Sequence, residues 1–323
     1  MGRPPNFLGI HRWSDWLDNG RCGRRCRVCT GTTRDVGMGR YRLGKGKTTL
    51  NNSFPSSDEL RELLDVATDL SLQAAEVHLR RQTGHINFKS TPTDLVSQVD
   101  HDAEQVIVAG ISKARPEDAI VGEEEALVSG SSGFRWVIDP LDGTVNYLYG
   151  FPSYSVSIAV EFDDVPIIGV VYDTAHDELY AAMIGHEATN NDQRIEVTSC
   201  SDLSTALLGT GFAYDAATRK RQALVLAALL PQVRDIRRAG SCAVDLCSVA
   251  GGRLDAFYET GVQWWDVAAG IAIVRAAGGV AAYEPLAKRI VASGPVVWEQ
   301  LRAAVNEAEI AAGSQYPCSS ASI

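Results

Sequence analysis

The feature that most constrains the fold of this chain is an apolar run that ends in two aspartates separated by a proline. It reads Trp136-Val-Ile-Asp-Pro-Leu-Asp-Gly-Thr-Val-Asn-Tyr147. Because Pro140 cannot donate a backbone hydrogen bond, a strand that reaches it must leave its ladder there. Asp139, Asp142 and Gly143 then predict a tight turn that brings both carboxylates and the Leu141 carbonyl into one small space. Two such charges cost free energy unless they share a proton or a cation, and we expect a cation.

Further acidic residues stand at the ends of other apolar runs. Glu123 follows a short expected strand and a glycine, and Asp266 follows two tryptophans at the start of an expected helix. Thr144 is expected to begin a helix whose first amides face the same space as the paired aspartates. The alternative is that Asp142 and Asp266 are simple helix caps. Four acids at such positions favour a metal site, and a donor set made of oxygen suits Mg2+.

The rest of the pattern predicts a layered α/β or α+β sandwich. Apolar and small or polar residues alternate through 154–162, and 167–172 and 178–183 continue what we expect to be an antiparallel meander. After residue 190 the pattern changes to helices alternating with strands. The expected helices cover about 57–74, 100–114, 217–231, 241–250 and 266–277, and the further expected strands cover 120–121, 135–138, 233–237, 256–258 and 279–283.

The first 53 residues differ from the rest in charge. They hold nine Arg and two Lys against three Asp, a net charge of +8, and little apolar periodicity. We expect a disordered extension here, with a transit peptide or translated upstream sequence as alternatives. A catalytic domain is expected over 54–312, with a metal-binding half at about 54–190 and a substrate half at 191–312, followed by a disordered tail at 313–323.

Two motifs in the basic segment are expected to carry no function. Cys22, Cys26 and Cys29 lack the paired spacing of a zinc site. Gly44-Lys-Gly-Lys-Thr48 lacks both the first glycine of a phosphate loop and the strand that should precede it.

Overall charge excludes some classes of function. A net charge of −10 argues against general binding of nucleic acid, so a phosphate ligand must be met by local charge, most simply by metal ions. The sequence has no apolar run long enough to cross a membrane and no secretory signal. The cysteines show no disulfide framework, which suits a reducing compartment. We therefore expect a cytoplasmic protein.

Two long motifs carry a family resemblance. Residues 136–144, together with Trp265-Asp-Val-Ala-Ala-Gly270 and its continuation to Gly279, resemble the two signature motifs of the inositol monophosphatase family. Gly122-Glu-Glu and residues 89–100 fit the family's remaining metal-site segments in order and spacing. The similarity covers about residues 58–310. Residues 185–191 replace a glycine-rich hairpin of the family, and we expect that hairpin to be shortened or disordered. The stretch after Pro285 is expected to be compressed.

The resemblance implies a Mg2+-dependent, Li+-sensitive phosphomonoesterase, usually a homodimer. It further implies the α/β/α/β/α layered sandwich of the sugar-phosphatase type, with two or three Mg2+ ions in each active site. Carried over residue by residue, the metal ligands would be Glu123, Asp139, the Leu141 carbonyl, Asp142 and Asp266. Glu123, Asp100 and Thr144 would be the catalytic residues, with the last two orienting the attacking water.

The resemblance also implies a substrate-binding side. The expected contacts are Asp142, Gly143, Thr144, Gly240, Ser241, Cys242, Glu259 and Asp266. Cys242 stands where the family usually has a small residue, so contacts with the sugar ring are expected to differ there. Glu259 would accept hydrogen bonds from substrate hydroxyls, although a solvated acid at the end of a strand is the plainer interpretation.

Three functions remain open from the sequence. The first is hydrolysis of inositol 1-phosphate or a similar polyol phosphate. The second is hydrolysis of histidinol phosphate, fructose 1,6-bisphosphate or a 3′-phosphoadenosine nucleotide, since the fold does not select among these. The third is binding to the RNA-synthesis machinery with catalysis secondary. Neither a membrane nor nucleic acid itself is expected as a direct partner.

Overall fold

The computed structural model describes residues 54–80, 87–88, 95–96, 98–124 and 126–314. These residues form two mixed sheets, one small hairpin and layers of helices. The predictions for the basic segment 1–53 and for the tail from 315 onward lie outside the described residues. No helix in the described ranges is long and apolar enough to span a bilayer.

The first sheet carries the expected meander. Its strand order is β10-β9-β8-β7-β6-β5-β3-β4, and every neighbouring pair is antiparallel except β3 with β5, which is parallel. The strands are β3 (Ala119–Gly122), β4 (Leu127–Val128), β5 (Phe134–Asp142), β6 (Ser155–Phe162), β7 (Val165–Asp173), β8 (Glu178–Met183), β9 (Thr189–Asn190) and β10 (Gln193–Arg194). A separate hairpin pairs β1 (Asn87–Phe88) with β2 (Leu95–Val96).

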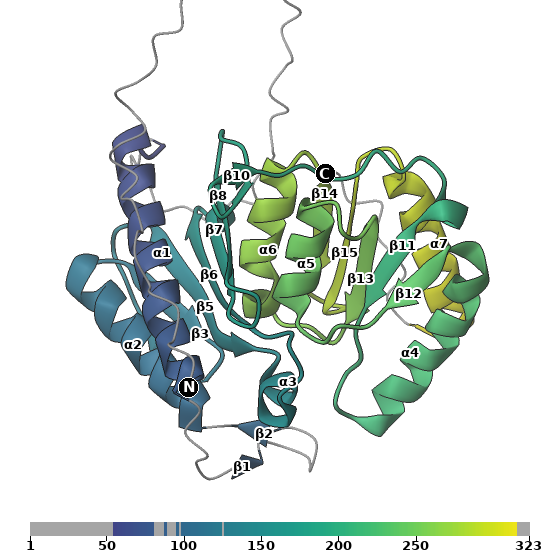
Figure 1. Cartoon of the computed structure of the whole chain (residues 1–323), viewed down its shortest axis with the longest axis horizontal. Helices are drawn as coiled ribbons and strands as arrows, with labels where there is room; N and C mark the ends of the chain where they lie inside the picture. Colours follow the sequence, from purple (N-terminus) through teal and green to yellow (C-terminus); the bar gives the residue numbers. More distant parts are fainter. Residues whose placement is uncertain (1–53, 81–86, 89–94, 97, 125, 315–323) are drawn as a thin grey trace, which may run out of the picture. The chain divides into compact units, whose positions relative to one another are not determined.

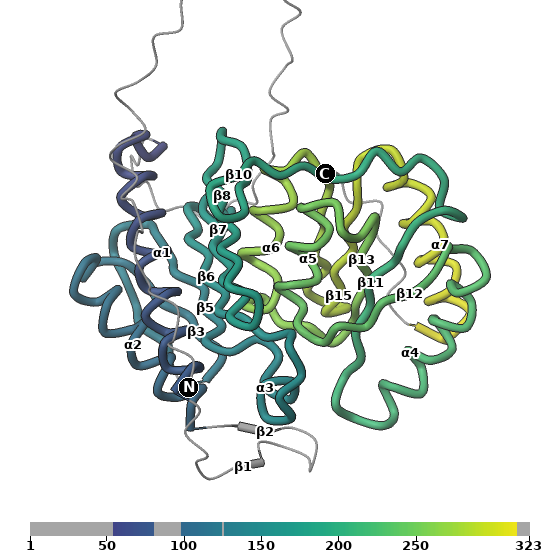
Figure 2. The backbone as a smooth tube through the Cα atoms, in the orientation of Figure 1, coloured from purple at the N-terminus to yellow at the C-terminus, as the bar shows by residue number. Residues whose placement is uncertain are grey.

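The second sheet follows in the chain, as the tube in Figure 2 shows, and has the order β12-β11-β13-β15-β14. Its strands are β11 (Leu207–Thr210), β12 (Asp235–Arg237), β13 (Ala256–Thr260), β14 (Val280–Glu284) and β15 (Arg289–Ser293). β11 is parallel to both of its neighbours, whereas β15 is antiparallel to β13 and β14.

Helices complete the layers. They are α1 (Ser57–Leu79), α2 (Gln98–Ala114), α3 (Thr144–Tyr149), α4 (Ala216–Leu229), α5 (Cys242–Ala250), α6 (Trp264–Ala276) and α7 (Trp298–Ala311), with 3-10 turns η2 (Leu203–Thr205) and η3 (Leu230–Gln232). In Figure 1, α1 and α2 lie against the first sheet, α5 and α6 lie between the two sheets, and α4 and α7 lie beyond the second. This α/β/α/β/α order confirms the expected fold class.

Apolar spacing explains the layers. Leu63 and Ala67 on α1 and Ile107 on α2 are fully buried in one core with Trp136 of β5. Full burial of such a leucine or isoleucine contributes about 1.5–3 kcal/mol, so these faces fix both helices on the sheet. Ser56 caps α1 through a hydrogen bond from the Glu59 amide, as expected for a helix that starts at residue 57.

The middle layer packs closely on the first sheet. A Cβ added to Gly169 of β7 would lie 2.4 Å from the Ala269 carbonyl oxygen of α6. Only a glycine permits this approach, so Gly169 allows α6 to pack directly against the strands of the first sheet. The start of α6 is thereby placed beside the end of β5.

Several details differ from the sequence-based expectations. The helix expected over 217–231 ends as an α-helix at Leu229 and continues as the turn η3, because Pro231 cannot extend it. The following strand begins only at Asp235. The stretch after Pro285 forms β15 and α7, neither of which was among the expected elements. Residues 189–194 form a hairpin in which Asn191 and Asp192 both take positive φ, as two-residue hairpin turns require.

Candidate metal centre

The paired aspartates lie on either side of a break in the pairing of β5 with β6. The strand does not stop at Pro140 as expected, because it runs on to Asp142 with a shift of register. Asp139 pairs with Ser157 of β6, and after a register shift Asp142 pairs with Ser155. Between them, the Leu141 amide donates to Asp139 Oδ1 at 3.0 Å instead of to a neighbouring strand. The turn is therefore closed by the side chain of one of its own aspartates.

Gly143 allows the chain to turn directly into α3. Its φ is +92°, and an added Cβ would lie 2.8 Å from the Ser153 carbonyl oxygen. A side chain would be strained by the backbone conformation and blocked by backbone atoms. Thr144 can therefore begin the helix immediately after Asp142 and Gly143, as the sequence predicted.

The Thr144 hydroxyl joins the turn to α2. Its Oγ1 lies 3.2 Å from Asp100 Oδ2 and 3.0 Å from the Leu141 carbonyl oxygen. A hydroxyl has one proton, so it donates to one of these oxygens at a time. Asp100 is buried in the first turn of α2. The structure thus brings the two expected water-orienting residues into contact at the edge of the acidic turn.

Glu123 reaches the same region from the neighbouring strand. It follows β3, which pairs in parallel with β5 so that Gly122 is opposite Ile138. Carboxyl ends of parallel neighbours lie at one edge of a sheet, which explains why acids at residues 123 and 139 approach each other.

Glu124 adds an acid that the sequence analysis did not select. Asp100, Glu123 and Glu124 each offer a carboxylate oxygen, and these oxygens lie within 4.8 Å of one another. The Glu124 amide also donates to Glu104 Oε1 at 3.1 Å. The run of three glutamates was the available signal, but neither periodicity nor spacing showed which of them faces inward.

Asp142 is held from the second half of the chain. Its Oδ2 accepts hydrogen bonds from Ser241 Oγ at 2.5 Å and from the Ala243 amide at 2.7 Å, at the start of α5. The helix-cap alternative is wrong for Asp142, because Gly143 occupies the N-cap position of α3 and no side chain caps it.

Asp266 does take part in a cap. Its Oδ2 accepts a hydrogen bond from the Gln263 amide at 2.7 Å, in a capping box at the start of α6. The helix begins at Trp264, two residues before the expected start, so Asp266 is its third residue. The alternative of a cap therefore accounts for one oxygen of this carboxylate.

The acids repel one another strongly. Burial raises the pKa of Asp139 well above its ordinary value, and the charges of Glu123, Asp142, Asp266 and Asp100 raise it further. Among the described residues, the principal charges acting on Asp139 are thus all negative. Burial likewise raises the pKa of Asp266, with Glu123 and Asp142 adding to the rise.

Asp142 shows the competing effects most clearly. Burial raises its pKa to about 6, while the hydrogen bonds from Ser241 and from the Ala243 amide lower it. Two donors thus offset only part of the cost of burying this charge. A group of acidic oxygens and a carbonyl with this much mutual repulsion fits a hard divalent cation, and Mg2+ is the common cation with that preference.

The expected substrate-binding residues lie next to Asp142. Gly240 has a φ of +102°, Ser241 is the N-cap of α5, and the buried Cys242 is the first residue of the helix. Glu259 on β13 has a pKa raised to about 8, first by burial and then by the charges of Asp245 and Asp142. Glu259 is half-buried, and the influence of Asp142 on its pKa indicates that it lies near the acidic turn.

Three further residues of this side escaped sequence analysis. Burial raises the pKa values of Glu259 and Asp245, and Arg238 offsets part of both rises, so it is a nearby cation in this half of the site. Asn146 on α3 donates to the Ala239 carbonyl at 2.9 Å and to the Ser153 carbonyl at 2.7 Å. Asn146 thus ties the acidic turn to the loop before α5, a contact between residues 93 apart that local pattern does not reveal.

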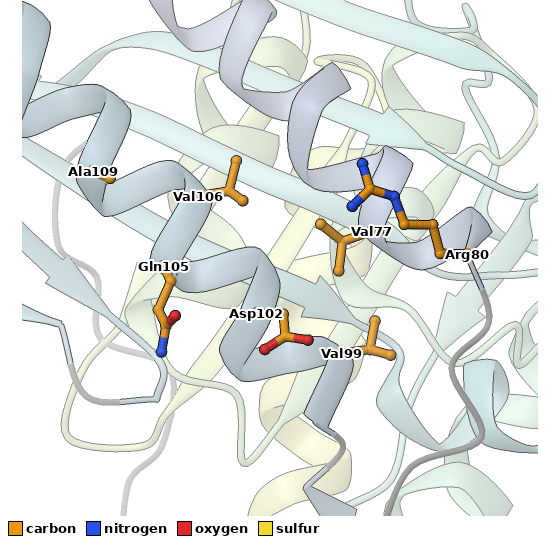
Figure 3. Close-up of a pocket in the computed structure, with 7 residues that line it drawn as sticks. All are labelled: Val77, Arg80, Val99, Asp102, Gln105, Val106 and Ala109. Carbon is orange, nitrogen blue, oxygen red and sulfur yellow. The ribbon is translucent and has the colours of Figure 1, made fainter.

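A separate cavity lies between α1 and α2. Its volume is about 470 Å3, and Figure 3 shows its lining of Val77, Arg80, Val99, Asp102, Gln105, Val106 and Ala109. None of the candidate ligands lines it. His176 and His186 are both exposed, and the His176 ring lies 2.8 Å from the Asp173 carboxylate.

Comparisons with known proteins identify the family of the chain. The model of the inositol monophosphatase family matches residues 59–312. An inositol-1-monophosphatase of Mycobacterium bovis is 43% identical over 236 residues, which cover 69% of this chain and 81% of that protein.

Relatives with a different name are also similar. A protein of Xylella fastidiosa named Nus factor SuhB is 46% identical over 199 residues, covering 61% of this chain and 72% of the relative. The solved structure of Mycobacterium tuberculosis SuhB matches with a TM-score of 0.69 and 40% identity, covering 78% of this chain and 98% of that one.

Proposed function

The chain belongs to the inositol monophosphatase family, and from that membership we propose that it is a Mg2+-dependent phosphomonoesterase acting on inositol 1-phosphate or a similar polyol phosphate. The observation that carries the proposal is the set of acids around Asp139. Burial raises the pKa of the Asp139 carboxyl group, and the charges of the neighbouring acids raise it further. Such a set is costly in a protein without a cation, and a phosphate ester is the substrate that bound cations would attract.

The metal ligands are assigned by similarity to the family. We assign Glu123, Asp139 and the Leu141 carbonyl to one Mg2+ ion and Asp139, Asp142 and Asp266 to a second. When bound, the ions would supply positive charge that offsets the charge of the phosphate, and they would lower the pKa of a water bound to them towards 7. Asp142 already accepts two hydrogen bonds through Oδ2, which fixes the direction of its carboxylate.

Thr144 and Asp100 would orient the attacking water. When the Thr144 hydroxyl donates to Asp100, its oxygen can accept a hydrogen bond from a water and so fix the water's orientation. Asp100 would then receive the proton of the Thr144 hydroxyl as that hydroxyl receives one from the water. Preorganised groups of this kind lower the barrier because they need no rearrangement during the reaction.

The substrate alcohol would lie toward the second sheet. Glu259 would accept a hydrogen bond from a ring hydroxyl, and the backbone of Gly240 and Ser241 would approach the ring. The Cys242 side chain is buried beside them, so it would shape the pocket by its volume.

A panel of phosphomonoesters tests the proposal. Phosphate release is measured with Mg2+ from inositol 1-phosphate, histidinol phosphate, fructose 1,6-bisphosphate and 3′-phosphoadenosine 5′-phosphate, with and without Li+. We expect inositol 1-phosphate or another polyol phosphate to give the highest kcat/KM, with inhibition by Li+. If one of the other three compounds is preferred, that compound becomes the assigned substrate. If pure, folded protein releases phosphate from none of them, the proposed phosphatase activity is rejected. Glu123→Gln is the matched inactive control.

A second candidate function has support in the relatives named Nus factor SuhB. Association with the RNA-synthesis machinery would use the surface of the protein and would not need the acids. The Glu123→Gln variant separates the two functions, because it should lose phosphate release and keep any such association. The expected homodimer and cytoplasmic location stay predictions, which light scattering and cell fractionation would test.

A further inference from the structure

One peptide unit in the acidic turn lacks partners from the sheet. The register of β5 on β6 shifts between Asp139 and Asp142, so Pro140 and Leu141 have no paired residue on that strand. The parallel pairing of β5 with β3 has already ended at Ile138. Buried carbonyl and amide groups still need hydrogen bonds. The partners of the Pro140–Leu141 peptide must therefore come from side chains.

The amide of this peptide is held by Asp139, and its carbonyl is held by His78. The Leu141 amide donates to Asp139 Oδ1 at 3.0 Å. On the opposite side of the same peptide plane, His78 Nε2 lies 2.9 Å from the Pro140 carbonyl oxygen. The peptide is thus bound to the Asp139 carboxylate at its amide and to a side chain of α1 at its carbonyl.

The contact fixes the tautomer of His78. A carbonyl oxygen only accepts, so Nε2 must carry a proton and donate it. His78 Nδ1 lies 3.1 Å from Thr174 Oγ1, and a neutral ring then accepts the hydroxyl proton there. Burial lowers the pKa of His78 to about 4, which keeps the ring neutral at pH 7.

Aromatic packing holds the ring in place. The imidazole centroid lies 5.9 Å from the ring of Tyr147 and 6.2 Å from the ring of Tyr154. The Tyr147 hydroxyl also donates to the His78 carbonyl at 2.9 Å. Only 1% of His78 is exposed, so water cannot replace it as the partner of Pro140.

We propose that His78 is a positioning residue of the metal centre, whose Nε2 proton fixes the Pro140–Leu141 peptide and thereby the Asp139 carboxylate. The inference rests on the proposed function, because it assumes that Asp139 binds Mg2+. The side-chain hydrogen bonds of His78 go to Thr174 and to the Pro140 carbonyl, and neither group is a candidate ligand. The effect of His78 passes through one hydrogen bond to the backbone and a second from the Leu141 amide to the carboxylate.

Two isosteric variants test the role. The amide nitrogen of Gln can occupy the position of Nε2, whereas Asn reaches only the position of Nδ1. His78→Gln therefore keeps a donor for Pro140, and His78→Asn removes it. Both variants lose the same aromatic contacts, so they serve as controls for each other's loss of packing.

The readout is Mg2+ binding to the substrate-free protein, measured by calorimetry, with the thermal midpoint recorded alongside. We expect His78→Asn to weaken Mg2+ binding about tenfold, the effect of losing one hydrogen bond to a buried acceptor. His78→Gln should bind Mg2+ within about twofold of the parent protein. In phosphate release, His78→Asn should need a correspondingly higher Mg2+ concentration for half-maximal rate.

The possible outcomes separate this inference from the proposed function. Equal Mg2+ affinity in both variants and the parent, with equal losses of thermal midpoint, would show a purely structural histidine and overturn the inference alone. Equal weakening in both variants would also overturn it, because the donor to Pro140 would then not matter. A parent protein that binds no Mg2+ would reject the inference together with the proposed function.

Discussion

Replacing Asp142 by Asn should make the metal-free protein more stable while removing its response to Mg2+. The Asp142 pKa rises from 3.8 to about 6 in the folded protein, because burial disfavours the charge. This rise corresponds to about 3 kcal/mol of destabilisation by the ionised form above pH 6. Asn carries no charge, and its side-chain oxygen keeps an acceptor for Ser241 and the Ala243 amide.

The sign and size of the effect depend on pH. A raised folded-state pKa means that the folded protein binds more protons than the unfolded chain, so the stability difference grows as pH rises. At pH 8 the Asp142→Asn protein should gain up to about 3 kcal/mol without metal, or roughly 6–12 °C in Tm. At pH 4 the gain should fall below about 1 kcal/mol, because little of the carboxyl group is ionised in the folded protein.

The assay is thermal unfolding at pH 4 and pH 8, with EDTA and with Mg2+. Mg2+ should raise the Tm of the parent protein and leave the Asp142→Asn protein unchanged, and phosphate release should be lost. Asp118→Asn is the matched control, because Asp118 is also buried but accepts hydrogen bonds from Arg115 Nε at 3.0 Å and Trp136 Nε1 at 2.9 Å. That variant should lose about 3 kcal/mol and keep its Mg2+ response. A lower Tm for Asp142→Asn at pH 8, with the response to Mg2+ retained, would refute the reasoning.

Three further predictions concern the same site. Raising pH from about 6.5 to 8 should destabilise the metal-free protein in urea unfolding, because burial raises the folded-state pKa of Glu259 to about 8 and unfolding then releases its proton. Below about pH 6.5 the lowered pKa of His78, about 4, acts in the opposite direction. Mg2+ should reverse most of the loss, and stability that rises between pH 6.5 and 8 would contradict this. Gly143→Ala should cost about 1–3 kcal/mol in the same assay, because its φ of +92° strains a side chain, and an unchanged midpoint would show that the turn relaxes. Deleting residues 1–53 should leave kcat and KM unchanged, because no candidate ligand lies there; a large drop in turnover would show that the segment contributes to the catalytic domain.

Much of the fold could be predicted because it depends on local pattern. The helical spacing of Leu60, Leu63 and Leu64 predicts α1, although the helix continues past the expected end at residue 74 to Leu79. The alternation in residues 154–162 predicts β6, although both faces of that strand are buried. The weaker predictions involve residues whose role depends on distant partners. The strand β15 was not predicted. Its first residue, Arg289, is a buried charged residue, and an ion pair with Glu284 balances that charge.

The sequence by itself determined which chemistry the centre can have. Asp139, Pro140, Asp142 and Gly143 are neighbours in the chain, so steric rules for proline and glycine alone require a turn with two carboxylates in it. The acids at residues 123 and 266 each follow an apolar run, which places them at the ends of elements. Oxygen donors at such positions predict a hard cation before any contact is known.

Only the tertiary structure decided how these residues meet. Asp142 receives its hydrogen bonds from Ser241 and Ala243, which are 99 and 101 residues away, because α5 packs between the two sheets. His78 reaches Pro140 across 62 residues, because the apolar face of α1 fixes the helix on the first sheet. Contacts of this kind depend on how the layers pack against one another. The local periodicity of a chain does not show which distant residue a side chain will contact.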